Sequence, residues 1–264
     1  MYTRNTMSKI LIVGSTHGHE RIGLLVIAAL KKLPITADNV EFIVGNPMAS
    51  EKGIPFLEND LNRIFPGKEH GTYEEMRAFE LSKKIAAVDV VIDIHSTKTT
   101  DLGDQSMIIV TKYDERTRAI LDLIRPPKIL CMKYKSENAL ISKAKIGIAF
   151  EYGKDDSAAV LQAILHDVAK ILCHLGVLQV NPYNNPRTTH ASGIYEAYDV
   201  LKKDFTGGYT LNKVVSNFVP IATGSIICTT NDGENVIANE DFYPILFGNN
   251  RYTEILGFKG RRLV

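Results

Sequence analysis

Apolar positions along the first two thirds of the chain follow two alternating patterns. Continuous apolar runs of β-type residues occupy residues 9–13, 40–45, 89–95, 106–111 and 146–151. Between them, residues 21–33, 72–87 and 156–176 repeat apolar positions every three or four residues, as amphipathic helices do. Continuous apolar strands are typical of sheets covered on both faces. We therefore predict an α/β fold with a mixed, largely parallel central sheet and helices on both faces.

The pattern changes after residue 178. Residues 180–193 are rich in Pro, Asn, Thr and Ser, and the short β-type runs that follow are separated by Gly, Pro and an Asn-Asp-Gly turn at 231–233. Such spacing predicts short strands and hairpins. We expect two domains, an α/β domain over 1–178 and a small β-rich domain over 179–264.

Composition adds exclusions rather than a function. The 264 residues are 45% hydrophobic and 23% charged with a formal net charge of +1, so no broadly basic surface for nucleic acid is expected. No apolar run is long enough to cross a membrane, and the first one is too short for a signal peptide. Three widely spaced cysteines are read as reduced thiols, which favours a cytoplasmic protein.

His17 and Glu20 directly follow the first predicted strand. In doubly wound sheets ligands bind at the carboxyl ends of the strands, which is where these residues fall. A plainer reading is that His17 caps the next helix and that Glu20 is a first-turn acid favoured by the helix dipole. The His-x-x-Glu spacing alone is little better than chance.

A second histidine changes that balance. His95 ends the strand at 89–95, and Asp93 lies two residues earlier on the same face. A catalytic zinc site takes about three His or carboxylate ligands and leaves one position for water, a count that His17, Glu20 and His95 satisfy. Asp93 then suits the carboxylate that orients a ligating histidine. Taken alone, His95 reads as a core histidine and Asp93 as a turn acid.

Two further polar features follow the same logic. Glu151 ends a wholly apolar strand, where a carboxylate serves either as a general base or as a helix-start acid. Asn62 and Arg63 stand side by side in a loop, and the planar guanidinium matches a substrate carboxylate. The alternative for this loop is a surface turn in which Asp60 pairs with Arg63.

Four motifs now occur together in a familiar order. "GSTHGHERIG", "NPMASEKGIPFLENDLNRIFPG", "DVVIDIHST" and "IAFEYG" resemble the aspartoacylase and succinylglutamate desuccinylase family. Its members are zinc amidohydrolases related in fold to the zinc carboxypeptidases. The tail at 241–260 also resembles the aspartoacylase C-terminal stretch, which favours aspartoacylase over desuccinylase.

The resemblance implies one Zn²⁺ per chain and a role for each of four residues near it. His17, Glu20 and His95 are expected to be the zinc ligands, and Glu151 the general base and acid. Gly18 is expected to let the chain turn so that His17 and Glu20 meet one ion.

The resemblance also assigns residues to the substrate. Asn62 and Arg63 are expected to bind the carboxylate of the amino-acid half, and Tyr252 to line the pocket from the C-terminal domain. Asp60 belongs to the same motif and is expected to orient this loop.

Several positions depart from the family pattern. Pro55 stands where the family has an arginine that polarises the scissile carbonyl, and loss of one such donor typically costs about 10²- to 10³-fold in kcat. Either Lys52 or the zinc itself substitutes, or the protein is slow, or it acts on another bond. The remaining departures are His19 for Asn, Asn249 for Glu, and Ile141 near the place of a basic residue, with Lys143 and Lys145 as approximate candidates.

These inferences predict a zinc-dependent amidohydrolase that deacylates an N-acyl acidic amino acid to a carboxylate and a free amino acid, with N-acetyl-L-aspartate as first choice. The alternatives are a succinylglutamate desuccinylase, another acyl-amino-acid or peptide hydrolase, and a metal-binding homologue with weak or no catalysis. A dinucleotide-binding protein is disfavoured because the Gly-x-Gly-x-x-Gly spacing is absent. The metal in the cell and the oligomeric state, a homo-oligomer included, are left open.

Overall fold

The computed structural model describes residues 8–97, 102, 106–134, 136–185, 193–249 and 252–263. The chain divides into two compact units, which are described separately. The first unit comprises residues 1–129 and 135–192, and the second comprises residues 130–134 and 193–264.

The first unit is built on a mixed, mostly parallel sheet. Neighbouring strands β2, β1, β3 and β6 are parallel, and β4 runs antiparallel to β6. This arrangement confirms the predicted fold class. In spatial order the strands are β2 (Val40–Val44), β1 (Ile10–Gly14), β3 (Val90–His95), β6 (Ile146–Glu151) and β4 (Met107–Val110).

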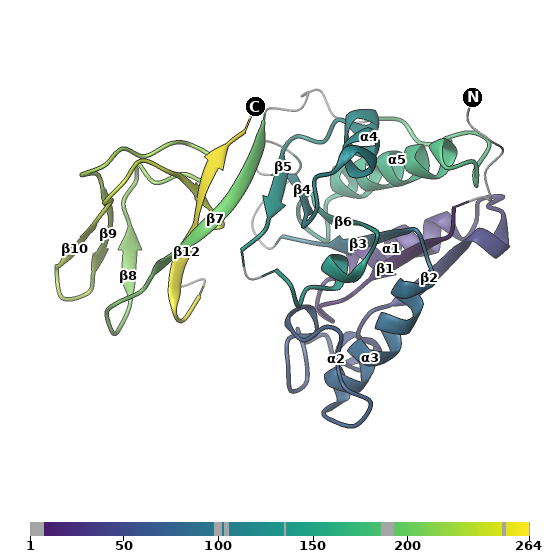
Figure 1. Cartoon of the computed structure of the whole chain (residues 1–264), viewed down its shortest axis with the longest axis horizontal. Helices are drawn as coiled ribbons and strands as arrows, with labels where there is room; N and C mark the ends of the chain where they lie inside the picture. The colour runs from purple at the N-terminus through teal and green to yellow at the C-terminus, as the bar shows by residue number, and fades with distance from the viewer. Residues whose placement is uncertain are drawn as a thin grey trace. The chain divides into compact units, whose positions relative to one another are not determined.

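Helices cover both faces of this sheet. In Figure 1, α4 and α5 lie on one side of it and α2 and α3 on the other. The α3 side holds a buried apolar cluster in which Leu11 and Val91 from the sheet meet Leu81 from the helix. The helical segments are α1 (Ile22–Leu30), α2 (Pro47–Lys52), α3 (Tyr73–Ala86), α4 (Glu115–Ile124) and α5 (Ala158–His174), with short 3-10 helices η1 (Ala37–Asn39), η2 (Leu61–Arg63) and η3 (Leu140–Lys143).

Local signals explain where the longer helices begin. Thr72 and Glu75 form a capping box at the start of α3, and the Ser157 hydroxyl accepts the Val160 N–H at the start of α5. Both helices occupy the segments that the sequence predicts. The sequence patterns did not identify α4 or the strand β5 (Ile129–Met132), which lie between residues 112 and 145.

The second unit is made of strands and turns in its described residues. Strands β5, β7, β12 and β11 are neighbours in one sheet, and β8, β9 and β10 form an antiparallel sheet of their own. Residues 231–234 connect β9 to β10 as the Asn-Asp-Gly turn predicts, with Gly233 at φ 88°. The bounds are β7 (Ile194–Lys202), β8 (Tyr209–Leu211), β9 (Ile226–Thr230), β10 (Asn235–Ile237), β11 (Tyr243–Ile245) and β12 (Ile255–Arg262).

The division into units differs in detail from the boundary that the sequence suggests. The second unit begins at residue 193 rather than near 179, and it includes residues 130–134. These five residues join it because β5 is the neighbour of β7 in the strand order. Strand pairing is made by the backbone, so a strand can join a sheet whose other members lie far along the chain.

The structure also describes the cysteines and the apolar character of the helices. The three cysteines are free thiols, and burial raises the pKa of Cys131 to about 11, so this thiol is protonated at neutral pH. Among the described residues, no helix has the length and apolar character needed to span a membrane.

Candidate metal centre

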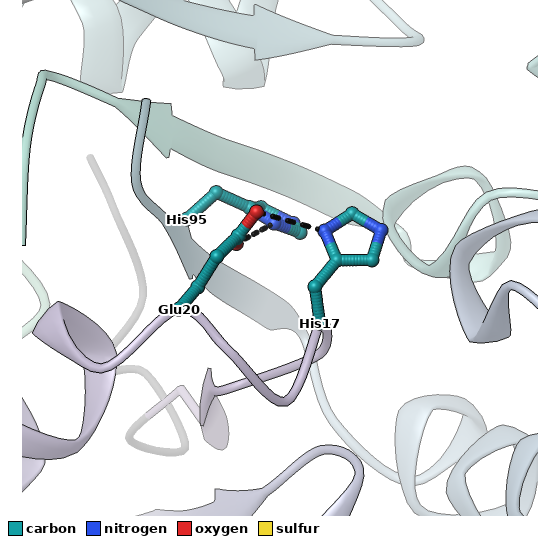
Figure 2. A group of neighbouring side chains, drawn as sticks. All are labelled: His17, Glu20 and His95. Atoms are coloured by element: carbon teal, nitrogen blue, oxygen red, sulfur yellow. Dashed lines mark hydrogen bonds and ion pairs between the residues drawn. The ribbon is translucent and has the colours of Figure 1, made fainter. Parts of the chain in front are cut away.

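His17, Glu20 and His95 meet at the carboxyl ends of β1 and β3. One potential ligand atom from each residue lies within 4.8 Å of those of the other two. Both histidines direct Nδ1 toward the Glu20 carboxylate, at 3.0 Å for His17 and 2.8 Å for His95, as Figure 2 shows. The structure therefore brings together the three residues that the sequence predicts as metal ligands. We call His17, Glu20 and His95 the metal group.

Close backbone packing shapes the loop that carries His17. A Cβ on Gly18 would lie 2.2 Å from the carbonyl carbon of Ala49 in α2, so only glycine fits there without moving that helix. The Gly18 N–H also donates to the Pro55 carbonyl at 3.1 Å. The Glu20 N–H donates to the His17 carbonyl at 3.0 Å and closes a turn over residues 17–20, and Ser15, where the loop begins, has a φ of 59° that is unusual for a residue other than glycine. Gly18 therefore lies in the turn that brings Glu20 back to His17, as expected, and the close approach to α2 is what requires a glycine at this position.

A carboxylate lies against the outer nitrogen of each histidine. His95 Nε2 is 2.8 Å from Asp93 Oδ2, and His17 Nε2 is 3.2 Å from Asp60 Oδ1. The Thr16 hydroxyl donates to the other oxygen of Asp93 at 2.7 Å. Metal-binding histidines commonly give their second N–H to a carboxylate, which fixes the ring and its tautomer. Asp93 and Asp60 occupy that place for His95 and His17.

In each residue of the group, burial opposes the charged form and the neighbouring partners favour it. Burial alone would lower the pKa of His17, but hydrogen bonds to Asp60 and Glu20 outweigh it and raise the pKa to about 9. Burial opposes the charged form of His95 as well, and the charges of Asp93 and Glu20 hold its pKa well above the usual value. Burial would raise the pKa of Glu20, but the two histidines lower it.

This donor set fits a zinc ion. Two imidazole nitrogens and a carboxylate, each histidine backed by a further carboxylate, match the composition of catalytic zinc sites with three protein ligands. Asp60 and Asp93 place two carboxylates next to the ligating histidines, which adds to the attraction of the site for a divalent cation.

Glu151 lies on the strand next to His95. The two residues are partners in the parallel register of β3 and β6, so their side chains leave the sheet on the same face, with strands about 4.8 Å apart. The residues after Glu151 are fixed by two contacts: the Thr97 N–H donates to the Gly153 carbonyl, and the Ser106 hydroxyl donates to the Tyr152 carbonyl. The half-buried Glu151 therefore ends its strand beside the metal group.

The expected substrate loop has one structural and one exposed residue. Asn62 Oδ1 accepts the Leu140 N–H at 2.9 Å, so this end of its amide holds η3 in place. The Arg63 side chain is 60% exposed, and its Nε lies 4.0 Å from Asp60 Oδ2, the limit of an ion pair. Arg63 is thus open to solvent, and its pairing with Asp60 is weak.

Asp155 has a role that the sequence analysis did not identify. Its Oδ1 accepts the N–H groups of Arg21 at 2.9 Å and Ile22 at 2.8 Å, so it caps α1 from a position 134 residues along the chain. The contact joins the loop after Glu151 to the helix that begins just after Glu20. Asp155 read in sequence as an acid near the start of α5, whereas Ser157 caps that helix.

A polar hollow of about 390 Å³ adjoins the metal group. His19 and Ser96, which line it, lie next to the predicted ligands in sequence, and the Ser96 N–H is 3.4 Å from Glu20 Oε2. The lining residues are His19, Ser96, Thr97, Lys154, Asp155 and Asp156.

Other candidates from the sequence lie elsewhere. Lys145 precedes β6, so about 20 Å of strand separates it from Glu151, and it pairs with Asp89 at 2.9 Å. Ile141 is buried in the apolar core. In the second unit, the Tyr252 ring meets Phe258 edge-on, and Asn249 accepts the Leu211 N–H. The expected role of Tyr252 at the substrate stays a prediction.

The chain is similar to known proteins over most of its length. The family model described as the succinylglutamate desuccinylase/aspartoacylase catalytic domain matches residues 6–174. A probable aspartoacylase of Nostoc sp. is 28% identical over 280 residues, covering 95% of this chain and 94% of the relative. An N-acyl-aromatic-L-amino acid amidohydrolase (carboxylate-forming) of Xenopus laevis is 24% identical, covering 94% and 92%.

Solved structures show the same fold. Murine aminoacylase 3 superposes with a TM-score of 0.77 at 19% identity, covering 99% of this chain and 97% of that one. A succinylglutamate desuccinylase from Vibrio parahaemolyticus gives a TM-score of 0.70 at 15% identity, covering 99% and 84%. The matched family model spans the first unit, including His17, Glu20, His95 and Glu151, and the chain belongs to the succinylglutamate desuccinylase/aspartoacylase family.

Proposed function

We propose that this protein is a zinc-dependent amidohydrolase that removes the acyl group from an N-acylated acidic amino acid, with N-acetyl-L-aspartate as first choice. The observation that carries the proposal is the convergence of His17, Glu20 and His95 with Glu151 on the adjacent strand. The family assignment, and the acyl-amino acid activities for which the relatives are named, support the same chemistry.

His17, Glu20 and His95 are the residues that would hold the zinc ion. A zinc ion in such a site lowers the pKa of water to about 7 and polarises a carbonyl. Asp60 and Asp93 fix the two imidazoles so that each presents Nδ1 to the centre of the group.

Glu151 moves the proton. Its carboxylate takes a proton from the attacking water and returns it to the nitrogen of the departing amino acid, so the amide C–N bond breaks with a neutral amine leaving. Such a general base and acid contributes roughly 10²- to 10⁴-fold in rate. The β3–β6 pairing holds Glu151 beside His95 while this happens.

Arg63 supports an acidic or at least carboxylate-bearing substrate. Its guanidinium is largely exposed in the loop that also contacts His17 through Asp60, and it binds a carboxylate through two parallel N–H groups. The adjoining hollow is lined by polar and charged side chains, which favours a polar acyl-amino acid over an aromatic one.

The test measures acetate release from N-acetyl-L-aspartate by the zinc-loaded protein. Glu151→Gln is expected to lower kcat by about 10²- to 10⁴-fold while zinc content stays unchanged. Glu115→Gln, an exposed glutamate of α4, is the matched control and leaves kcat as it is. Acetate release that survives both removal of the metal and Glu151→Gln would disprove the proposal.

Lys154 in the hollow is a reason to test a second substrate class, acyl groups that carry their own carboxylate. A panel of N-acetyl-aspartate, N-acetyl-glutamate, N-succinyl-glutamate and N-acetyl-phenylalanine separates the candidates. A preference for the succinyl compound would assign the protein to the desuccinylases, and a preference for the phenylalanine derivative would contradict the acidic substrate.

Pro55 favours a third candidate, a metal-binding homologue with slow turnover. Its side chain supplies no cation, although its backbone contacts the His17 loop. Pro55→Arg keeps the carbonyl that receives the Gly18 N–H, and if the missing donor limits the rate we expect kcat to rise by up to about 10²-fold. Stoichiometric zinc binding without hydrolysis of any panel compound, before and after this substitution, would identify the homologue.

A further inference from the structure

Glu74 is a buried carboxylate that does not touch the metal group. It lies in the first turn of α3, and its exposed fraction is 0%. Its Oε1 accepts N–H groups from the Asn46 side chain at 3.1 Å and the Leu57 backbone at 2.6 Å, and its Oε2 accepts those of Glu58 at 3.2 Å and Asn59 at 3.3 Å. Three consecutive backbone donors thus converge on one side chain.

The contacts account for a charge at this depth. Burial alone would raise the pKa of Glu74, but the hydrogen bonds from Leu57, Asn46 and its neighbours outweigh it and lower the pKa. Hydrogen bonds to an ionised group are about twice as strong as neutral ones. A buried acid with these donors holds its surroundings more firmly than an apolar side chain of the same size would.

Two reciprocal contacts join the same segments. Glu58 Oε2 accepts the Tyr73 N–H at 3.0 Å, and the Asn59 side-chain amide donates to the Thr72 hydroxyl at 2.9 Å. Residues 57–59 are therefore fixed to the start of α3 by groups on both sides.

The fixed segment leads directly to the metal group. Asp60 follows Asn59, and its Oδ1 is the atom that lies 3.2 Å from His17 Nε2. The same oxygen accepts the Asn62 N–H at 2.9 Å, which places the turn that carries Arg63.

A second route runs through Asn46. Its side chain caps α2 through the Ala49 N–H while donating to Glu74, and its own N–H donates to the Ser15 carbonyl at 3.0 Å. Ser15 begins the loop that carries His17, and Ala49 is the residue against which Gly18 packs. Glu74 thus contacts both segments that border this loop.

We infer that Glu74 is a positioning residue: it fixes residues 57–63 and, through Asp60, the orientation of the His17 imidazole and the place of Arg63. The inference rests on the proposed function only for what His17 and Arg63 do. It predicts that loss of Glu74 affects His17 more than His95, because Asp93 on β3 holds His95.

The experiment compares Glu74→Gln with Glu80→Gln, an exposed ion-pair residue on the same helix. In the metal-free protein, the NMR signals of the His17 ring are expected to shift or broaden in Glu74→Gln more than those of His95, whose ring centroid lies 5.1 Å from that of His17. Zinc affinity, measured by competition with a chelator, is expected to fall, but by less than the roughly 10- to 100-fold that is typical for a direct partner of a metal ligand, because Glu74 acts through Asp60. KM for N-acetyl-aspartate rises because Arg63 is displaced. Glu80→Gln changes none of these.

A purely structural role has a different outcome. Glu74→Gln would then lower the melting temperature while the His17 signals and zinc affinity stay at wild-type values, and the inference would be overturned. If Glu74→Gln does not fold, the double variant Glu58→Ala with Asn59→Ala removes the reciprocal contacts and keeps Glu74. It is expected to shift the His17 signals by a smaller amount than Glu74→Gln does, and unchanged His17 signals would overturn the inference in that variant too.

The outcomes also separate the two proposals. Loss of zinc affinity and a shift of His17 in Glu74→Gln, in a protein that hydrolyses none of the panel, would support the positioning role and contradict the function. Hydrolysis of N-acetyl-aspartate that is independent of Glu74, with His17 unshifted, would do the reverse.

Discussion

The two histidines of the metal group are held by partners at very different distances along the chain. His95 pairs with Asp93, two residues earlier on the same buried strand, and its side chain is 2% exposed. His17 lies in a loop, pairs with Asp60 at a separation of 43 residues, and its side chain is 20% exposed. One half of the group is complete once β3 forms, and the other half is assembled only when distant loops have packed.

The difference follows from the geometry of strands and loops. Residues i and i+2 of a strand leave the sheet on the same face, so Asp93 and His95 are neighbours in any β-strand that contains them. A loop has no such rule. His17 depends on the close approach of Gly18 to α2, on the Pro55 carbonyl, and on residues 57–59 that Glu74 holds.

The largest expected difference concerns removal of the histidines themselves. His95→Ala leaves Asp93 and Glu20 buried without their cation and is expected to lower the free energy of unfolding of the metal-free protein by about 3–5 kcal/mol. His17→Ala is expected to cost about 1 kcal/mol, because water reaches its more exposed partners. Urea denaturation measures both, and equal costs would refute the contrast between strand and loop.

The outer carboxylates test the same contrast in metal affinity. Asp93→Asn and Asp60→Asn are each expected to weaken zinc binding by about 10- to 100-fold, with Asp93 at the upper end because its contact is shorter and buried. Asp89→Asn, just before the other end of β3, is the control and leaves the affinity unchanged. A larger effect at Asp60 would show that the loop, not the strand, dominates.

A smaller effect is expected where the two halves share a residue. Glu20 contacts both histidines, and Asp155 caps the helix that begins just after it. Asp155→Ala is expected to cost about 1 kcal/mol of stability, the usual cost of a lost cap. Hydrogen exchange of the Arg21 and Ile22 amides is expected to become faster in Asp155→Ala and to stay unchanged in the control, Asp156→Ala. Equal exchange rates in the two variants would show that Asp155 does not stabilise the segment next to Glu20.

The smallest expected effect is the pH dependence of the stability that Glu74 contributes. Hydrogen bonds lower the pKa of Glu74 in the folded protein, so its stabilising contribution is present above the unfolded value, near 4.5, and is lost as pH falls through the lower folded value. The stability difference between wild type and Glu74→Gln is therefore expected to be constant between pH 8 and 6 and to shrink in acid. Urea titrations at several pH values measure it, and a difference that grows in acid would contradict the assigned direction.

Sequence reasoning was most successful where the signal is local. The apolar runs located strands β1, β2, β3, β4 and β6, and the three residues at two strand ends that the sequence predicts as ligands lie close together in the structure. It was least successful between residues 112 and 145, where it missed α4 and β5. It placed Gly18 in the turn between His17 and Glu20 but did not reveal the packing of Gly18 against α2, because a close approach between segments leaves no trace in the sequence around the glycine.

By itself the sequence determined five strands of the sheet, the family resemblance and the placement of Asp93 beside His95, because apolar runs, short motifs and strand periodicity act over a few residues. Only the tertiary structure decided that Asp60 contacts His17, that Asp155 caps α1 and that Glu74 gathers the donors of residues 57–59. Those contacts join residues 15 to 134 positions apart, and each depends on the path of the folded chain and on buried polar groups finding partners.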